Sequence, residues 1–299
     1  MNVRLPVLAL LCWLAFPDLA AGQGRTDAAQ LSRTLHQTYQ GWRNSMVRKD
    51  AKSWQRYTAR PRRVNVKNRI LSERRRFPQS VFALPAAPPS LANLKALRMR
   101  VKGPTAKATY FGKVDFGVGG EPTENLYVID FQKEGKAWRY NGAEFVNLNH
   151  IPKVRKALKA GDLKFLDHAD FKPDGILERA GTELKRAVPW IAKAYVYCPG
   201  REVQLKVNRV SDHLFQNTKR ADTVIGGARS GANEVTWTIR DIEGGDPKAP
   251  ITVRVYLMSE IRGQQPIKAF EYQITDGSKP KERNTVQFKV TPEMTSLLR

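Results

Sequence analysis

The chain has 299 residues, which is enough for two domains of ordinary size, each with its own core. Its 51 Lys and Arg against 28 Asp and Glu give a formal net charge of +23, and such an excess attracts anionic surfaces and polymers. After the first 22 residues, no stretch approaches the ~20 apolar residues that a membrane-spanning helix requires, so the composition excludes an integral helical membrane protein.

The first 22 residues have the pattern of a cleaved secretory signal peptide. Arg4 supplies a positive charge, residues 5–16 are an apolar run too short to span a bilayer, and the small residues of 20–22 follow. We therefore expect residues 1–22 to be a signal peptide and the mature protein to be exported, to the periplasm or the extracellular space.

The cysteines constrain the chemistry of the mature chain. Cys12 lies in the predicted signal, and Leu11 occupies the place where a small residue should precede a lipidated cysteine, which disfavours a lipoprotein. Cys198 then remains alone, so no internal disulfide can form. Cys198 would be nucleophilic only beside a histidine, and a buried, unreactive thiol is the alternative.

The positive charge is concentrated near the N-terminus. Residues 25–76 hold fifteen Lys and Arg against three Asp and Glu, and residues 77–114 add six basic residues and no acidic one. Residues 115–148 reverse the sign, with six acidic against three basic residues. This asymmetry indicates an interaction with an anionic partner. The alternatives are a contribution to solubility and a generally basic proteome.

Three helices are expected in the first part of the chain. Residues 26–48 carry an apolar stripe at helical spacing that should face a core. The stripe consists of Leu31, Leu35, Tyr39, Trp42 and Met46. Asp50 is a candidate N-cap for a second helix over 51–58, which Arg60-Pro61 should end. A third helix is predicted from Val64 to Arg76.

After the Pro-rich segment 84–89, period-two patterns predict four antiparallel strands up to residue 148. The segments LSRTLHQTYQGWRNSMVRKDAKSWQRYTA, NRILSERRRFP and ENLYVIDFQKEGKAWRYNGAEFVNL give the order of three helices and a four-stranded meander. Residues 26–148 thereby resemble the NTF2-like (SnoaL-like, ketosteroid-isomerase-like) superfamily. The resemblance implies an α+β cone, in which three helices and a curved antiparallel sheet enclose a pocket or a core.

Residues 149–190 are expected to be a connector, helical in part over 153–166 and again over 176–187. The remaining residues, 191–299, show short alternating strands separated by turns, among them 251–258 and 267–274, which predicts an all-β sandwich. With the turn Gly231-Ala232-Asn233, this part resembles carbohydrate-binding-like or immunoglobulin-like sandwiches. That resemblance implies sugar binding as one candidate function.

The main candidate site is a cationic surface for polyanions on the third predicted helix and its approach. Its residues are Arg62, Arg63, Lys67, Arg69, Arg74, Arg75 and Arg76. Trp54 or Tyr57 could stack on a ring if exposed. The same side chains could instead be a solvated helical face or contribute to a pocket. Because the aromatic residues follow the stripe expected to be buried, the electrostatic part of this hypothesis is the stronger one.

Asp130 is the candidate for a catalytic base, since it lies within the apolar run 127–131 and burial would raise its pKa. Tyr39, Tyr57 or Tyr110 could donate a hydrogen bond to a developing oxyanion. Isomerases of the superfamily that the chain resembles use an Asp base with Tyr donors. A structural pairing of Asp130 with Arg98, Arg100 or Arg139 is the competing interpretation.

Signatures of metal and cofactor sites are missing. The histidines are scattered, the segment Asp167-His168-Ala169-Asp170 lacks the spacing of a calcium loop, and Gly226–Gly231 does not lead into a helix. We therefore expect no metal and no cofactor.

The function expected from the sequence is that of an exported binding or assembly protein rather than an enzyme. Its partner would be an anionic polymer such as an envelope polyanion, an acidic glycan, or an acidic protein, and homo-oligomerisation remains open. The alternatives are a small-molecule lyase, isomerase or ligand-binding protein that uses the cone, and a carbohydrate-binding protein that uses the sandwich.

Overall fold

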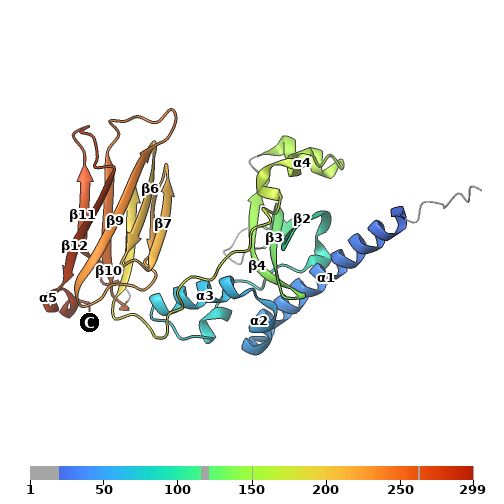
Figure 1. The fold of residues 1–299 in the computed structure, drawn as a ribbon, viewed down its shortest axis with the longest axis horizontal. Coiled ribbons are helices and arrows are strands. Elements are labelled where there is room, and N and C mark those ends of the chain that lie inside the picture. Colours follow the sequence, from blue (N-terminus) through green and yellow to red (C-terminus); the bar gives the residue numbers. More distant parts are fainter. Residues whose placement is uncertain (1–19, 116–120, 150, 262, 299) are drawn as a thin grey trace, which may run out of the picture.

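The computed structural model describes residues 20–115, 121–149, 151–261 and 263–298. These residues form a mixed α+β part and an all-β part, which lie at opposite ends of an elongated molecule (Figure 1). All three sheets are four-stranded and antiparallel. The predicted signal peptide lies outside the described residues except for its last three, which belong to the first helix. Within the described residues, no helix is long and apolar enough to span a membrane.

Three helices begin the described chain, as expected: α1 (Ala20–Arg48), α2 (Ala51–Tyr57) and α3 (Arg60–Ser72). The stripe on α1 is buried from Leu35 to Met46. Asp50 caps α2, because its carboxylate accepts hydrogen bonds from the amides of Lys52 and Ser53 at 3.0 and 3.1 Å.

Helix α3 differs from the prediction at both ends. It begins at Arg60, four residues early, because Pro61 lies in the first turn, where a missing N–H costs no intrahelical bond. It ends at Ser72, four residues early. Arg74 adopts a left-handed conformation (φ 53°), and the amides of Arg74 and Arg75 bind the carbonyls of Leu71 and Ile70. The run Arg74–Arg76 therefore follows the helix instead of belonging to it.

The first sheet is the predicted meander, with strand order β1-β2-β3-β4. Its strands are β1 (Lys95–Lys102), β2 (Thr105–Val114), β3 (Thr123–Glu134) and β4 (Ala137–Asn147). Side chains alternate across β3, so Tyr127 and Ile129 pack with α1 while Leu126 and Val128 pack on the opposite face. The sheet is thus covered on both sides, by α1–α3 on one face and by the connector on the other.

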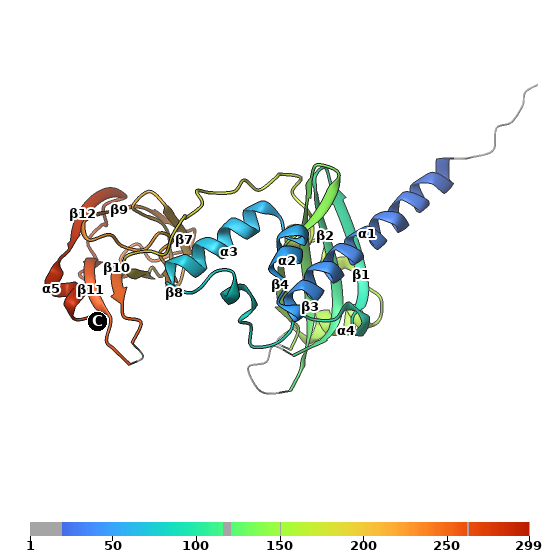
Figure 2. The ribbon, with the colours of Figure 1, turned by 90° about the horizontal axis from the view of Figure 1, so that it is seen from below.

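The connector contains α4 (Pro152–Lys159), η3 (Lys164–Asp167) and η4 (Ala169–Phe171). The helix expected over 176–187 is wrong, since this segment has no helical structure. Tertiary hydrogen bonds hold it extended. Gln132 binds the backbone of Glu178 through both of its amide atoms, and Asn68 binds the Thr182 carbonyl and the Leu184 amide. Figure 2 shows the segment running beside α3.

Eight strands form the C-terminal part: β5 (Ile191–Tyr197), β6 (Arg201–Val207), β7 (Ser211–Gln216), β8 (Lys219–Thr223), β9 (Gly231–Asp241), β10 (Ile251–Met258), β11 (Ile267–Ile274) and β12 (Arg283–Val290). They make two sheets, β11-β10-β5-β8 and β12-β9-β6-β7. The two sheets pack face to face. Inward side chains from both sheets form one core, in which Trp237 and Phe215 are fully buried. The short helix α5 (Pro292–Ser296) follows β12.

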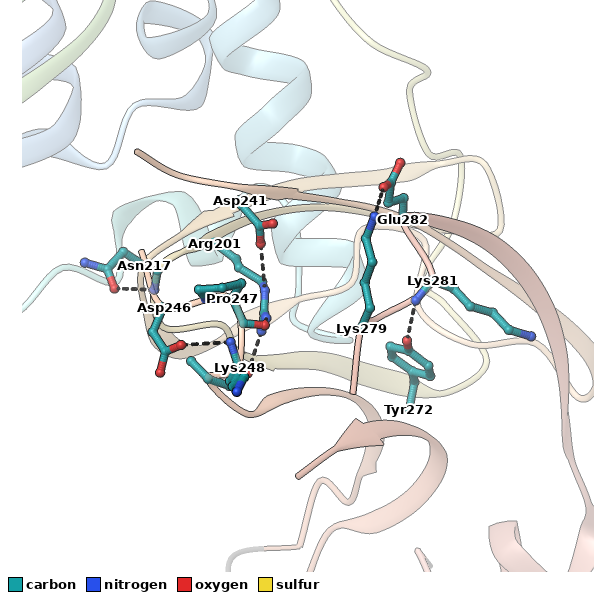
Figure 3. Close-up of polar contacts among 12 residues, drawn as sticks. Arg201, Asn217, Asp241, Asp246, Pro247, Lys248, Tyr272, Lys279, Lys281 and Glu282 are labelled. Atoms are coloured by element: carbon teal, nitrogen blue, oxygen red, sulfur yellow. Dashed lines mark hydrogen bonds and ion pairs between the residues drawn. The ribbon is translucent and has the colours of Figure 1, made fainter. Parts of the chain in front are cut away.

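A buried arginine organises one end of this part (Figure 3). Arg201 is 1% exposed, and its guanidinium donates to Asp241 at 3.0 Å, to the Ala249 carbonyl at 2.6 Å and to the Pro247 carbonyl. Because these acceptors lie at the end of β9 and in the loop before β10, the arginine fixes that loop against β6.

The end of α3 joins the two parts of the molecule (Figure 2). The hydroxyl of Ser72 accepts a hydrogen bond from the Gly226 amide at 2.9 Å, and the Leu71 carbonyl accepts one from the Val188 amide at 3.2 Å. Arg74 donates to the Pro189 carbonyl at 2.6 Å and forms an ion pair with Glu260. The last turn of α3 is therefore a docking element for the C-terminal part.

Candidate anion-binding site at helix α3

The seven cationic residues singled out in the sequence do not form one surface. Arg62 and Arg69 are seven positions apart on α3 and line one cavity together with Arg75. Arg63 and Lys67 line a second cavity, beside the first along the helix. Arg74 faces the C-terminal part, and Arg76 is exposed after the helix.

The first cavity, which we call the arginine pocket, has a volume of about 320 Å³ and lies among α1, α2, α3, residues 80–84 and β4. Its floor is apolar and aromatic. The floor residues include Trp42, Trp54, Val66, Ile70, Val81 and Tyr140. The rings of Trp42 and Tyr140 stack with centroids 3.8 Å apart and an interplanar angle of 19°. The stripe of α1 thus supplies a rigid aromatic base for the pocket.

Charged side chains surround this floor. Arg62, Arg69, Arg75 and Glu73 line the pocket, which leaves two positive charges in excess. Glu73 pairs with Arg69 at 3.2 Å and with Arg75 at 3.5 Å. Arg62 has no carboxylate within ion-pair distance among the residues that the structure describes. Arg62 is therefore the cation most available to an incoming anion.

The electrostatics of Tyr140 indicate where the charge of Arg62 acts. Burial raises the pKa of the Tyr140 hydroxyl, while the nearby positive charge of Arg62 opposes this shift. The positive charge of Arg62 therefore acts on the floor of the pocket, where Tyr140 lies.

The second cavity, of about 260 Å³, is lined by the cations Arg60, Arg63 and Lys67 and by Glu183, so it has the same excess of two positive charges as the arginine pocket. Lys67 pairs with Glu183 of the connector at 2.5 Å and lies 5.7 Å from the ring centroid of Phe77. The hydrogen bond from Lys67 lowers the pKa of Glu183. Arg63 is intermediate in exposure, and its Nε atom is buried without a hydrogen-bond partner among the described residues. Because this cavity is smaller than the arginine pocket and has fewer apolar lining residues, it is the weaker candidate for a ligand site.

Asp130 lies on the opposite face of the sheet from the tyrosines proposed to assist it. It lines a polar cavity of about 450 Å³ beneath the connector, while Tyr39 and Tyr110 belong to the core between the sheet and the helices. Its partner is Lys107 at 3.0 Å, and not one of the arginines expected from the sequence. Burial raises the pKa of Asp130, and the hydrogen bond and charge of Lys107 oppose the shift.

Two of the three arginines proposed as partners of Asp130 have another role. Arg98 and Arg100 on β1 both pair with Asp167 of the connector, at 2.7 and 2.5 Å, and these bonds lower the pKa of Asp167. Two neighbouring cations on the edge strand thus hold η3 against the sheet. Asp167, the first residue of the segment tested for calcium-loop spacing, is therefore engaged in ion pairs with the sheet.

The remaining candidates are placed as follows. Cys198 is fully buried, and burial raises the pKa of its thiol. Among the described residues, no cluster of three or more His, Cys, Asp or Glu could hold a metal ion. Every aromatic side chain within the described part of 195–291 is buried or half-buried, so a flat, exposed aromatic platform for sugars is missing there.

Two residues of the arginine pocket had no assigned role in the sequence. Neither Tyr140 nor Glu73 is among the candidate residues singled out in the sequence. The spacing of Arg62, Val66 and Arg69 is a signal that could have located the pocket, since these positions share one helix face. Their meeting with β4 depends on the tertiary fold.

Comparisons with protein families, with curated proteins and with solved structures find no match to this chain. Its function is therefore inferred from the geometry and charge of the sites described above.

Proposed function

We propose that this protein is an exported, non-catalytic binding or assembly protein that engages anionic partners through the cations around α3. The observation that carries the proposal is the arginine pocket, where Arg62, Arg69 and Arg75 surround an aromatic floor and only Glu73 offsets their charge. Arginine is well suited to this role, because its planar fork binds carboxylate and phosphate groups in a bidentate way.

The proposal includes the fold families of the two parts and the cellular location of the protein. The N-terminal part would be an NTF2-like cone and the C-terminal part an immunoglobulin-like or carbohydrate-binding-like sandwich. The order of helices and meander supports the first assignment, and the two facing sheets support the second. The partner would be an envelope polyanion, an acidic glycan or an acidic protein in the periplasm or outside the cell.

The geometry does not favour the isomerase alternative, because the sheet separates Asp130 from Tyr39 and Tyr110. It does not favour sugar stacking on the sandwich either, since Trp237 is 1% exposed and packs inside. A binding role at α3 is the function that the positions of the charged residues support best.

Retention on immobilised heparin, eluted with a salt gradient, tests the proposal. We compare a variant with Arg62, Arg69, Arg75 and Arg76 all changed to Gln with a variant that carries the same charge change elsewhere. The matched control changes Lys136, Lys153, Lys156 and Lys172 to Gln, all of which are exposed. The first variant should elute at clearly lower salt than the control. Equal elution of the two variants, or no retention of the wild type, would contradict the proposal.

A further inference from the structure

We infer that the arginine pocket binds a small anionic amphiphile, in which a single carboxylate or phosphate head group is attached to an apolar body. This inference deepens the proposed function and rests on it, because it names the ligand class for the same site. A charged polymer would use only the exposed rim, whereas the pocket offers a rim and a floor of different chemistry.

The floor selects for apolar surface. Trp54 is 3% exposed, Ile70 is 5% exposed and Val81 is 6% exposed, although all three line the pocket. Thr58 also lines it, but its hydroxyl already donates to the Trp54 carbonyl at 2.6 Å. A hydrated anion placed on this floor would lose water without gaining a partner, whereas an acyl chain or ring would gain contact area.

The rim selects for a single anionic head group. Glu73 shows how a carboxylate is held here, since its two oxygens pair with Arg69 and Arg75. An incoming head group finds Arg62 unpaired with any carboxylate among the described residues, and it can compete with Glu73 for the other two arginines. The two excess positive charges of the pocket favour the anionic over the neutral form of such a ligand.

The size of the pocket limits the ligand. Its volume of about 320 Å³ is near the lower end of the roughly 300–1,000 Å³ of ligand pockets. The exposed side of the pocket is formed in part by Leu84, which is 49% exposed. A short acyl chain could therefore enter over Leu84 and leave its head group among the arginines.

Isothermal titration calorimetry with three probes tests the inference: octanoate, acetate and octyl glucoside. Octanoate combines charge and chain, acetate carries only the charge, and octyl glucoside carries a chain of the same length without charge. We expect octanoate to bind and the two others to bind at least about tenfold more weakly. Equal binding of octanoate and acetate, equal binding of octanoate and octyl glucoside, or no octanoate binding would overturn the inference.

Variants locate the binding in the pocket. Arg62→Gln should weaken octanoate binding about tenfold, because one charged hydrogen bond is lost. Arg76→Gln, at an exposed arginine that does not line the pocket, is the matched control. Glu73→Gln should tighten binding severalfold because it removes the competing carboxylate. An Arg62→Gln protein that binds as the wild type does would overturn the inference.

A second pair of variants tests the apolar part. Leu84→Ser should weaken octanoate binding, whereas Leu177→Ser should not, since Leu177 is similarly exposed (45%) and lies outside the pocket. Equal effects of these two substitutions would overturn the assignment of the acyl chain to this pocket.

Retention on heparin distinguishes failure of the proposed function from failure of this inference. If the protein is retained on heparin but does not bind octanoate, only the binding of an anionic amphiphile is refuted. If it binds octanoate but is not retained on heparin, only the binding of an anionic polymer is refuted.

Discussion

The hydroxyl of Thr223 donates a hydrogen bond to Glu73 at 3.3 Å, which links the sandwich to the end of α3 across 150 residues of sequence. The same carboxylate pairs with Arg69 and Arg75 in the arginine pocket. One side chain is therefore shared between the candidate binding site and the contact between the two parts of the molecule.

Thr223→Val should reduce the free energy of unfolding by about 0.5–1 kcal/mol, because it removes one hydrogen-bond donor and keeps the shape of the side chain. A double-mutant cycle with Glu73→Ala, which removes the acceptor, followed by urea denaturation, measures the coupling of the pair. Additive effects of the two substitutions would show that the hydrogen bond contributes nothing measurable. Thr236→Val, on the outer face of β9, is the control, since its hydroxyl binds Thr285 alone among the described residues.

Ser72→Ala should weaken the docking of α3 on the sandwich. Ser72 is fully buried, and its hydroxyl donates to the Asn68 carbonyl at 2.6 Å while accepting from the Gly226 amide. The variant leaves that amide without its acceptor, at a cost of about 1–3 kcal/mol. Amide hydrogen exchange at Gly226 should become faster. Ser296→Ala, at an exposed serine whose hydroxyl donates to the Glu293 carbonyl of its own helix α5, should leave this exchange unchanged.

Arg201→Leu should destabilise the sandwich by about 3 kcal/mol, because it removes the partner of Asp241 and of two loop carbonyls. Arg201→Lys should cost less, since one ammonium group can replace only part of the fork. Urea denaturation followed by the fluorescence of the tryptophans, of which Trp237 lies in the sandwich core, measures both. Equal stability of the Leu variant and the wild type would show that the loop holds without the arginine.

His213 predicts a pH dependence of stability. Burial lowers the pKa of His213, with Arg220 in the same direction and the carboxylates of Asp222 and Asp212 opposing. The Ser211 hydroxyl accepts from the Ile225 amide, so it can donate to Nε2 of His213, 2.5 Å away, when the ring is neutral. The folded state thus favours the uncharged imidazole.

The direction in which stability changes with pH follows from proton uptake by the unfolded chain. As the pH falls below about 6.5, the unfolded chain binds a proton at His213 that the folded chain does not. The free energy of unfolding should therefore decrease from pH 7 to pH 5, and this decrease should be smaller in His213→Phe. Denaturation curves across this range measure the slope. If the free energy of unfolding changes with pH by the same amount in the wild type and in His213→Phe, His213 is not the source of the pH dependence, even if the two proteins differ in stability at pH 7.

The local sequence determined most of the secondary structure, because capping residues, apolar periodicity and strand alternation act over a few positions. The stripe of α1, the Asp50 cap, the four-stranded meander and the bounds of β10 and β11 were predicted correctly. The excess of cations before residue 115 was also visible in the sequence, since charge needs no fold to be counted.

The tertiary structure decided where those charges lie. The Schellman motif after Ser72 turns Arg74 toward Glu260, while Arg75 remains beside the pocket. Distant hydrogen bonds to Gln132 and Asn68 override the helical pattern of 176–187. The arginine pocket itself exists only because α3 packs near Trp42 and Tyr140, and contacts between residues so far apart in sequence depend on how the layers pack.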